Sequence, residues 1–188
     1  ITSLAFVLTF IFPHSLGEFT MLVNTVMFLI QAALLGKAFG KVQLLQLPAA
    51  LLFSACIDGW MYILGFWKTG SYVGQVLMLL LGCVFLGLGI AFEVIPNVLI
   101  LPGEGLVRVI AGLTGWRFGL VKTGFDMSIV ASAVGVSLFF TGHVLGIREG
   151  TVLAALIVGS ISHFFIEKVS NVLEGWIPDY SDAGDACP

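Results

Sequence analysis

Residues 73–95 read VGQVLMLLLGCVFLGLGIAFEVI and contain a single charged residue, Glu93. A helix needs about 20 consecutive apolar residues to cross the hydrocarbon core of a bilayer. A helix that is apolar on every side must be buried in protein or surrounded by lipid. This stretch therefore predicts a transmembrane helix, which ends before Pro96.

The composition of the whole chain indicates the same environment. Hydrophobic residues make up 59% of the 188 residues, and charged residues make up 10%, whereas about a quarter of a soluble domain is charged. These few polar residues cannot cover a water-facing surface. The surface of the protein therefore contacts the lipid bilayer. The net charge is −3 and the sequence has no basic patch, which argues against nucleic-acid binding.

Other apolar stretches are also long enough to span a bilayer. They are Leu16–Leu35, Leu44–Phe66, Phe118–Thr141 and Gly150–Val172. We therefore predict an all-α polytopic membrane protein with about five full transmembrane helices. A chain of this length has no room for a separate soluble domain.

Two segments are apolar but too short or too interrupted to span. Ile1–Phe12 stops at a proline, and residues 96–115 read PNVLILPGEGLVRVIAGLTG, with two prolines and two charges. The second segment predicts a short helix from Gly105 to Leu113 after a Pro-Gly turn. Non-helical backbone at membrane depth occurs only where it is buried in protein or lines a wet cavity. We therefore expect short re-entrant helices that point toward the centre of the bundle.

A weak internal repeat connects the two halves of the chain. SLGEFTMLVN (15–24) aligns with RFGLVKTGFD (117–126), so Gly17 matches Gly119 and Asn24 matches Asp126. QLPAALLFSACID aligns with TVLAALIVGSISH through a shared Ala-Ala-Leu, which places Asp58 opposite His163. The alignment predicts two units that each contain a span, a short helix and two more spans.

The predicted boundaries are 1–72 for the first repeat and 73–173 for the second, followed by an acidic disordered tail at 174–188. The first unit lacks an opening span, so we expect the native protein to continue upstream of Ile1. Crossing short helices would make the halves parallel, and re-entrant ones would make them inverted. The positive-inside rule favours the inverted arrangement. It groups five basic residues on one side and two on the other: Lys37, Lys41, Arg108, Arg117 and Lys168 against Lys68 and Arg148.

The predicted substrate or ion site consists of ionisable and polar groups inside the spans, together with the Pro-Gly turn. Charges inside a membrane are energetically costly, so they commonly mark a functional site. The site residues are Asn24, Asp58, Pro102, Gly103, Glu104, Gly105, Arg108, Lys122, Asp126 and His163. Asp58 is an isolated carboxylate at mid-span, which requires a partner, a proton or water. Lys122 and Asp126 are four residues apart and share a helix face.

Each of these residues also has a purely structural interpretation. Lys122 and Asp126 could form an ion pair that only stabilises the fold, and Glu104 could cap the short helix. His163 could be a hydrogen-bonded residue between helices. These alternatives stay open on the sequence alone.

Signals of enzymatic or cofactor chemistry are weak in this sequence. It contains no Walker A, HExxH, GxSxG or GxGxxG sequence, and its three cysteines form no CxxC pair. An intramembrane enzyme would need a nucleophile and base at one depth, for which His163 with Asp58 is the sole hint. We therefore predict neither an enzyme nor a bound metal or cofactor.

Several stretches resemble a known family. LPGEGLVRVIAGLTGWRFGLVKTGFDMSIV (101–130) and GIREGTVLAALIVGSISHFF (146–165) are similar to the YczE/YyaS/YitT family of bacterial membrane proteins. SLGEFTMLVN, the Gln-Leu-Pro at 46–48 and the IDGW at 57–60 extend the resemblance over the first half. The resemblance implies a multi-pass protein of the bacterial cytoplasmic (inner) membrane and mildly favours transport.

We interpret the chain as a transporter or permease for a small polar or charged solute. Coupling to ions or to protons, through Asp58, Asp126 or His163, is compatible with this interpretation. The alternative is a non-transporting membrane regulator or an assembly partner of another membrane complex. A homo-oligomer is compatible with either function.

Overall fold

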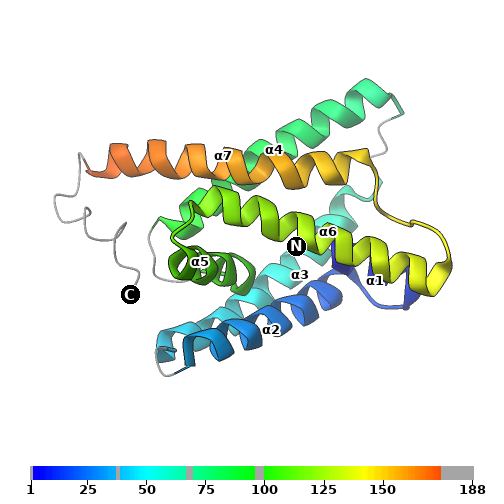
Figure 1. Ribbon diagram of the computed structural model, residues 1–188. Helices are drawn as coiled ribbons and strands as arrows, with labels where there is room; N and C mark the ends of the chain where they lie inside the picture. The colour runs from blue at the N-terminus through cyan, green and yellow to red at the C-terminus, as the bar shows by residue number, and fades with distance from the viewer. Residues whose placement is uncertain (1, 37–38, 67–69, 96–99, 175–188) are drawn as a thin grey trace.

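The computed structural model describes residues 2–36, 39–66, 70–95 and 100–174 (Figure 1). These residues form helices joined by short connections, with no β-strand among them. The helices are α1 (Thr2–Ile11), α2 (Leu16–Leu35), the 3-10 helix η2 (Lys41–Leu45), α3 (Gln46–Leu64), α4 (Tyr72–Val94), α5 (Pro102–Thr114), α6 (Phe118–Thr141) and α7 (Glu149–Glu174). Residues 175–188 of the predicted tail, and the basic residues Lys37 and Lys68, lie outside the described residues.

The five predicted spans are confirmed as helices. α2 and α6 begin and end at the predicted residues, and the ends of α3, α4 and α7 differ from the prediction by two residues or fewer. In the described part of the chain, five helices are long and apolar enough to cross a membrane. Large apolar side chains such as Phe92 and Phe139 lie exposed on the outside, as lipid-facing residues do. The protein is therefore a multi-pass, all-α membrane protein.

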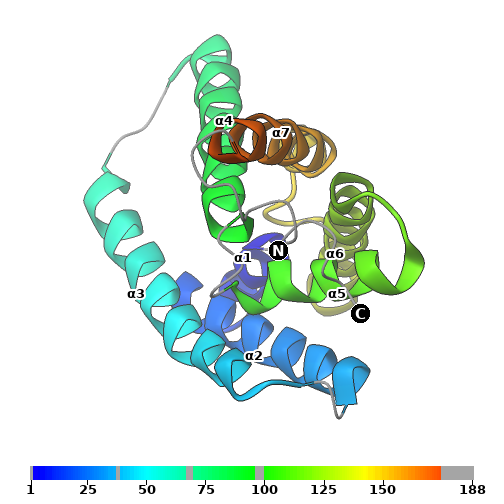
Figure 2. The same cartoon turned by 90° about the vertical axis from the view of Figure 1, so that its left-hand side faces the viewer.

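The long helices form two groups around the two short ones. α4 packs against α7, which packs against α6, whereas α2 packs against α3. Figure 2 shows α1 and α5 between these groups. α1 contacts α2 and α6, and α5 contacts α6 and α2, so each short helix joins the two groups.

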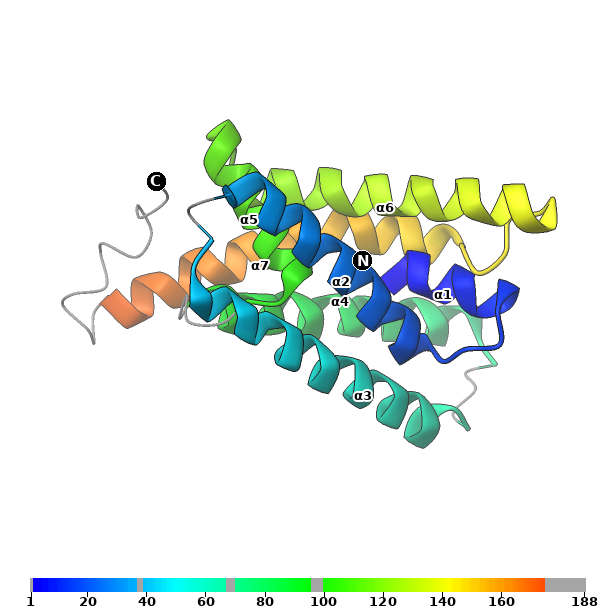
Figure 3. The same ribbon diagram turned by 90° about the horizontal axis from the view of Figure 1, so that it is seen from below.

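The two short helices do not have the length of a membrane span. α1 has 10 residues and α5 has 13, which correspond to about 15 and 20 Å, whereas the hydrocarbon core is about 30 Å thick. In Figure 3, α4 and α6 run in opposite directions, so α4 ends and α6 begins at the same end of the bundle. α5 therefore connects two helix ends that lie on the same side.

The start of α5 differs from the prediction. The helix was expected from Gly105 after a Pro-Gly turn, but it begins at Pro102, so the whole PGEG segment is its first turn. Proline suits this position because its φ is already helical and its missing N–H would have no partner inside the helix. Gly115, with a left-handed φ of 71°, ends the helix.

Glycines allow the closest helix crossings. A Cβ atom on Gly119 of α6 would lie 2.8 Å from the carbonyl oxygen of Gly159 and 2.9 Å from Cβ of His163, both on α7. A Cβ atom on Gly17 of α2 would contact the carbonyl oxygen of Ser54 and lie 2.6 Å from Cγ of Asp58, both on α3. Side chains at either glycine would push the helices apart, so small residues set both crossings.

Candidate functional site: a charged cavity between the helices

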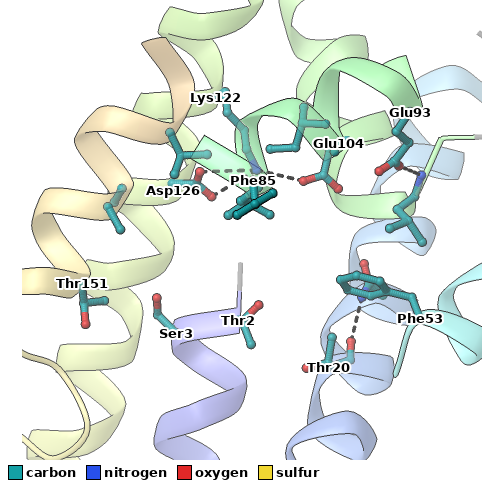
Figure 4. Close-up of a pocket in the computed structure, with 18 of the residues that line it drawn as sticks. Thr2, Ser3, Thr20, Phe53, Phe85, Glu93, Glu104, Lys122, Asp126 and Thr151 are labelled. Atoms are coloured by element: carbon teal, nitrogen blue, oxygen red, sulfur yellow. Dashed lines mark hydrogen bonds and ion pairs between the residues drawn. The ribbon is translucent and has the colours of Figure 1, made fainter. Parts of the chain in front are cut away.

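A cavity of about 400 Å³ lies between the two groups of helices (Figure 4). The side chains around it are mostly apolar, with a cluster of polar ones. The polar lining residues are Thr2, Ser3, Thr20, Asn24, Glu93, Glu104, Lys122, Asp126 and Thr151. Asn24, Glu104, Lys122 and Asp126 were predicted site residues, and the fold brings them together although they come from three helices.

Lys122 is the centre of the charged cluster. Lys122 is 2% exposed, and its Nζ lies 3.0 Å from Oε1 of Glu104 and 3.3 Å from Oδ2 of Asp126. Asp126 is one turn further along α6, whereas Glu104 reaches Lys122 because α5 packs against α6. A buried ammonium group requires such partners, since an unpaired charge away from water is strongly unfavourable. The predicted pair is thus part of a cluster of three charges.

Glu104 does not cap its own helix. The side chain of Leu101, the N-cap residue of α5, makes no capping hydrogen bond, and the Glu104 carboxylate accepts a hydrogen bond from Lys122. Instead, the Leu101 N–H donates a hydrogen bond to the carboxylate of Glu93 on α4. Glu93 is not one of the site residues predicted from the sequence. The sequence feature that could have indicated Glu93 is the position of an acidic residue in the last turn of an otherwise apolar span, directly before a short helix.

Asn24 brings an amide into the cavity from α2. Asn24 is 3% exposed, and its Nδ2 donates a hydrogen bond to the carbonyl oxygen of Thr20 at 3.0 Å. Asn24 therefore places a polar side chain in the cavity wall beside the charged cluster.

Asp58 and His163 lie outside the lining of this cavity. Asp58 accepts hydrogen bonds from Oγ of Ser15 at 2.6 Å and from the N–H of Gly17 at 2.7 Å, at the start of α2. His163 packs beside Gly119, with Nδ1 3.9 Å from Oε2 of Glu167. Asp58 therefore joins α3 to the start of α2, whereas the ion pair of His163 lies within α7.

The remaining predicted site residues belong to α5 and do not line the cavity either. Pro102, Gly103 and Gly105 are buried in its first turn, and Arg108 is half-buried one turn later. A Cβ atom on Gly105 would lie 3.0 Å from Oε1 of Gln31, so this glycine allows α5 to approach α2. These residues position Glu104 at the cavity.

Asp58→Asn is expected to lower the free energy of unfolding by about 1–2 kcal/mol, because the hydrogen bonds at the start of α2 would lose their charged acceptor. Chemical unfolding in mixed micelles measures this change. Glu167→Gln is the matched control, because that carboxylate is 70% exposed. A variant with unchanged stability would show that Asp58 does not anchor α2.

The cluster offers charges and hydrogen bonds to a ligand and lacks the features of a metal centre. Within the described ranges, no group of three or more His, Cys, Asp or Glu residues is arranged to hold a metal ion. The cavity presents carboxylates, one ammonium group, hydroxyls and an amide oxygen, surrounded by apolar walls. Such a site can bind a small solute that carries a charged or polar group.

Comparison with known proteins gives related sequences. Residues 1–167 match the model of DUF6198, a family of unknown function. The chain is also 27% identical over 138 residues to the uncharacterized membrane protein YczE of Bacillus subtilis (strain 168), an alignment that covers 73% of this chain. The alignment covers 60% of YczE, less than two thirds of that protein's length. No solved structure matches the chain.

Proposed function

The chain belongs to the DUF6198 family, and we propose that it is a transporter or permease for a small polar or charged solute. The observation that carries this proposal is the position of the Lys122, Glu104 and Asp126 cluster, which lines a cavity of about 400 Å³ inside an otherwise apolar bundle. Ionisable groups within membrane helices are costly and commonly belong to solute or proton pathways. A purely structural ion pair would need no open space beside it.

The contacts between helices support the predicted repeat. If α1, α2 and α3 correspond to α5, α6 and α7, the contact of α1 with α6 corresponds to that of α5 with α2, and both contacts exist. The alignment also matches Gly17, Ser54 and Asp58 with Gly119, Gly159 and His163. In each set the glycine packs against the carbonyl oxygen of the second residue and the side chain of the third. Repeats of 1–72 and 73–173 account for both sets of contacts.

The short helices support the re-entrant, inverted arrangement. Thr2 and Ser3 at the start of α1, and Leu101 and Glu104 at the start of α5, line the same cavity. Many secondary transporters place the N-termini of discontinuous helices at a substrate site between inverted repeats. Since α4 ends where α6 begins, α5 would enter and leave the membrane on one side.

The location we propose is the bacterial cytoplasmic membrane. The similarity to YczE of Bacillus subtilis, described as a membrane protein, supports this location. Solute transport across that membrane would use the five candidate spans as the scaffold of the cavity.

Asp126→Asn is expected to reduce solute flux at least about tenfold, because a hydrogen bond to a charged group contributes about 1.5–3 kcal/mol. Counterflow in proteoliposomes, with labelled amines, amino acids, carboxylates and sugars, measures the flux. Glu167→Gln on the outside of α7 is the control and should retain the wild-type rate. Absence of flux for every solute with the folded wild-type protein would reject transport.

One observation favours the alternative of a regulator or assembly partner. In the most apolar stretch of Gln43–Leu64, only 11% of the residues are buried, compared with 39% in that of Leu16–Leu35. Most of α3 is therefore available to another membrane protein. Photocrosslinking from Leu52, which is 69% exposed, would capture such a protein in native membranes. A specific crosslinked protein combined with no flux in proteoliposomes would favour this alternative.

A further inference from the structure

We propose that a further transmembrane helix of the same polypeptide packs against an exposed face of α3, in the place that α4 has on α7. This inference rests on the proposed repeat and is independent of solute transport. The interaction surface is the face of α3 that contains Phe53 and Cys56, here called the open face. The repeat alignment matches these two residues with Val158 and Ile161 of α7.

The matching face of α7 is covered by α4. Val158 is 3% exposed and packs in one apolar cluster with Cys83 and Ile90 of α4. A Cβ atom on Gly87 of α4 would lie 2.5 Å from Cγ2 of Ile161, so the two helices approach closely at this point. Figure 2 shows α4 alongside α7. In the second half of the chain, this face is therefore a contact between two helices.

The open face of α3 has apolar side chains too, but they are exposed. Phe53 is 40% exposed, against 3% for its counterpart Val158, and Cys56 is exposed as well. Both residues lie near the middle of α3, so the open face is at membrane depth. Lipid can also cover an apolar surface of this kind. The exposed fraction therefore does not by itself identify the occupant.

The wall of the cavity favours a helix over lipid as the occupant. In the second half, α4, α5, α6 and α7 all line the cavity, and α1, α2 and α3 line it in the first half. Thr20 and Asn24 of α2 occupy the positions that the alignment matches with Lys122 and Asp126 of α6. Among the described helices, α4 is the lining helix without an equivalent in the first half. A helix on the open face would complete the wall beside Phe53 and separate the charged cluster from lipid, where charges are costly.

The order of the helices indicates which chain supplies this helix. α4 directly precedes the short helix α5, so by the repeat the equivalent helix directly precedes α1 in the same polypeptide. The 138 aligned residues are 73% of this chain and 60% of YczE, so YczE is about one fifth longer. One fifth of 188 residues is nearly 40, which is enough for a span of about 20 residues and its connection.

A photocrosslink from the open face identifies the occupant. p-Benzoylphenylalanine replaces Phe53 in the protein expressed from its complete reading frame, and mass spectrometry maps the peptides crosslinked in native membranes. The expected product is a crosslink within one polypeptide, to an apolar segment that precedes Ile1. The same crosslinker in place of Phe139, which is 85% exposed on α6, should not react with that segment.

A substitution tests the cover independently of the crosslinker. Cys56→Trp is expected to lower the Tm by about 5 °C, because a large side chain would be forced into a packed contact. Leu51→Trp is the matched control and should leave the Tm unchanged, since Leu51 is 60% exposed and its counterpart Leu156 is 46% exposed. Thermal unfolding of the complete protein in nanodiscs measures both values.

Other outcomes overturn the proposal. Crosslinks to lipid alone, to a second copy of the chain or to a separate membrane protein would each reject a helix of the same polypeptide. A separate protein would favour the assembly-partner alternative instead. Equal Tm values for Cys56→Trp and Leu51→Trp would show that the open face contacts lipid. If the variant at Phe53 fails to fold, the crosslinker in place of Cys56 makes the same comparison.

Discussion

Lys122→Met is expected to lower the free energy of unfolding by about 3–5 kcal/mol, the effect of removing one partner from a buried ion pair. The variant leaves the carboxylates of Glu104 and Asp126 without the ammonium group that lies 3.0 and 3.3 Å from them. Their mutual repulsion then adds to the unfavourable burial of each charge. Chemical unfolding in mixed micelles measures the change.

A compensated variant separates the structural contribution of Lys122 from its functional one. The triple substitution Lys122→Met, Glu104→Gln and Asp126→Asn removes all three charges, so most of the lost stability should return. If the cluster binds the solute, this stable protein should still show no flux in proteoliposomes. Wild-type flux in the triple variant would make the cluster purely structural, the alternative that the sequence left open.

The sequence predicted the parts of the site that depend on short spacings. The five spans follow from the length of the apolar runs, and the pairing of Lys122 with Asp126 follows from their separation by one helical turn. Asn24 was recognised as the counterpart of Asp126 in the internal repeat, and Glu104 through its position in the PGEG segment. Their approach to the same cavity depends on the packing of α5 and α2, which the sequence alone does not define.

The residues that the sequence described poorly have partners far away in the chain. Asp58 looked isolated because its donors, Ser15 and Gly17, precede it by 43 and 41 residues. Glu93 was missed because its partner is a backbone N–H, that of Leu101, and any residue can provide such a group. A sequence shows which side chains are charged or polar. It does not show which backbone N–H groups at helix ends lie beside them, because that depends on the fold.

The matched glycines connect the repeat to a measurable property. Gly119→Ala is expected to lower the free energy of unfolding by about 1–3 kcal/mol, because forcing a methyl group into a closely packed contact costs this much. The obstacles are the Gly159 carbonyl oxygen at 2.8 Å and His163 Cβ at 2.9 Å. The carbonyl belongs to the backbone of α7 and cannot rotate away, so the two helices must separate.

Gly124 on the same helix provides the control for this substitution. A Cβ atom there would have no heavy atom within 4 Å, so Gly124→Ala should be neutral or should stabilise α6 by up to about 1 kcal/mol through its helix propensity. Gly17→Ala should destabilise the α2–α3 crossing as much as Gly119→Ala destabilises α6–α7, since the two glycines face equivalent partners. Equal stabilities of Gly119→Ala and Gly124→Ala would contradict the close crossing. A neutral Gly17→Ala beside a destabilising Gly119→Ala would contradict the equivalence of the two halves, because the repeat requires both crossings to depend on the absence of a side chain.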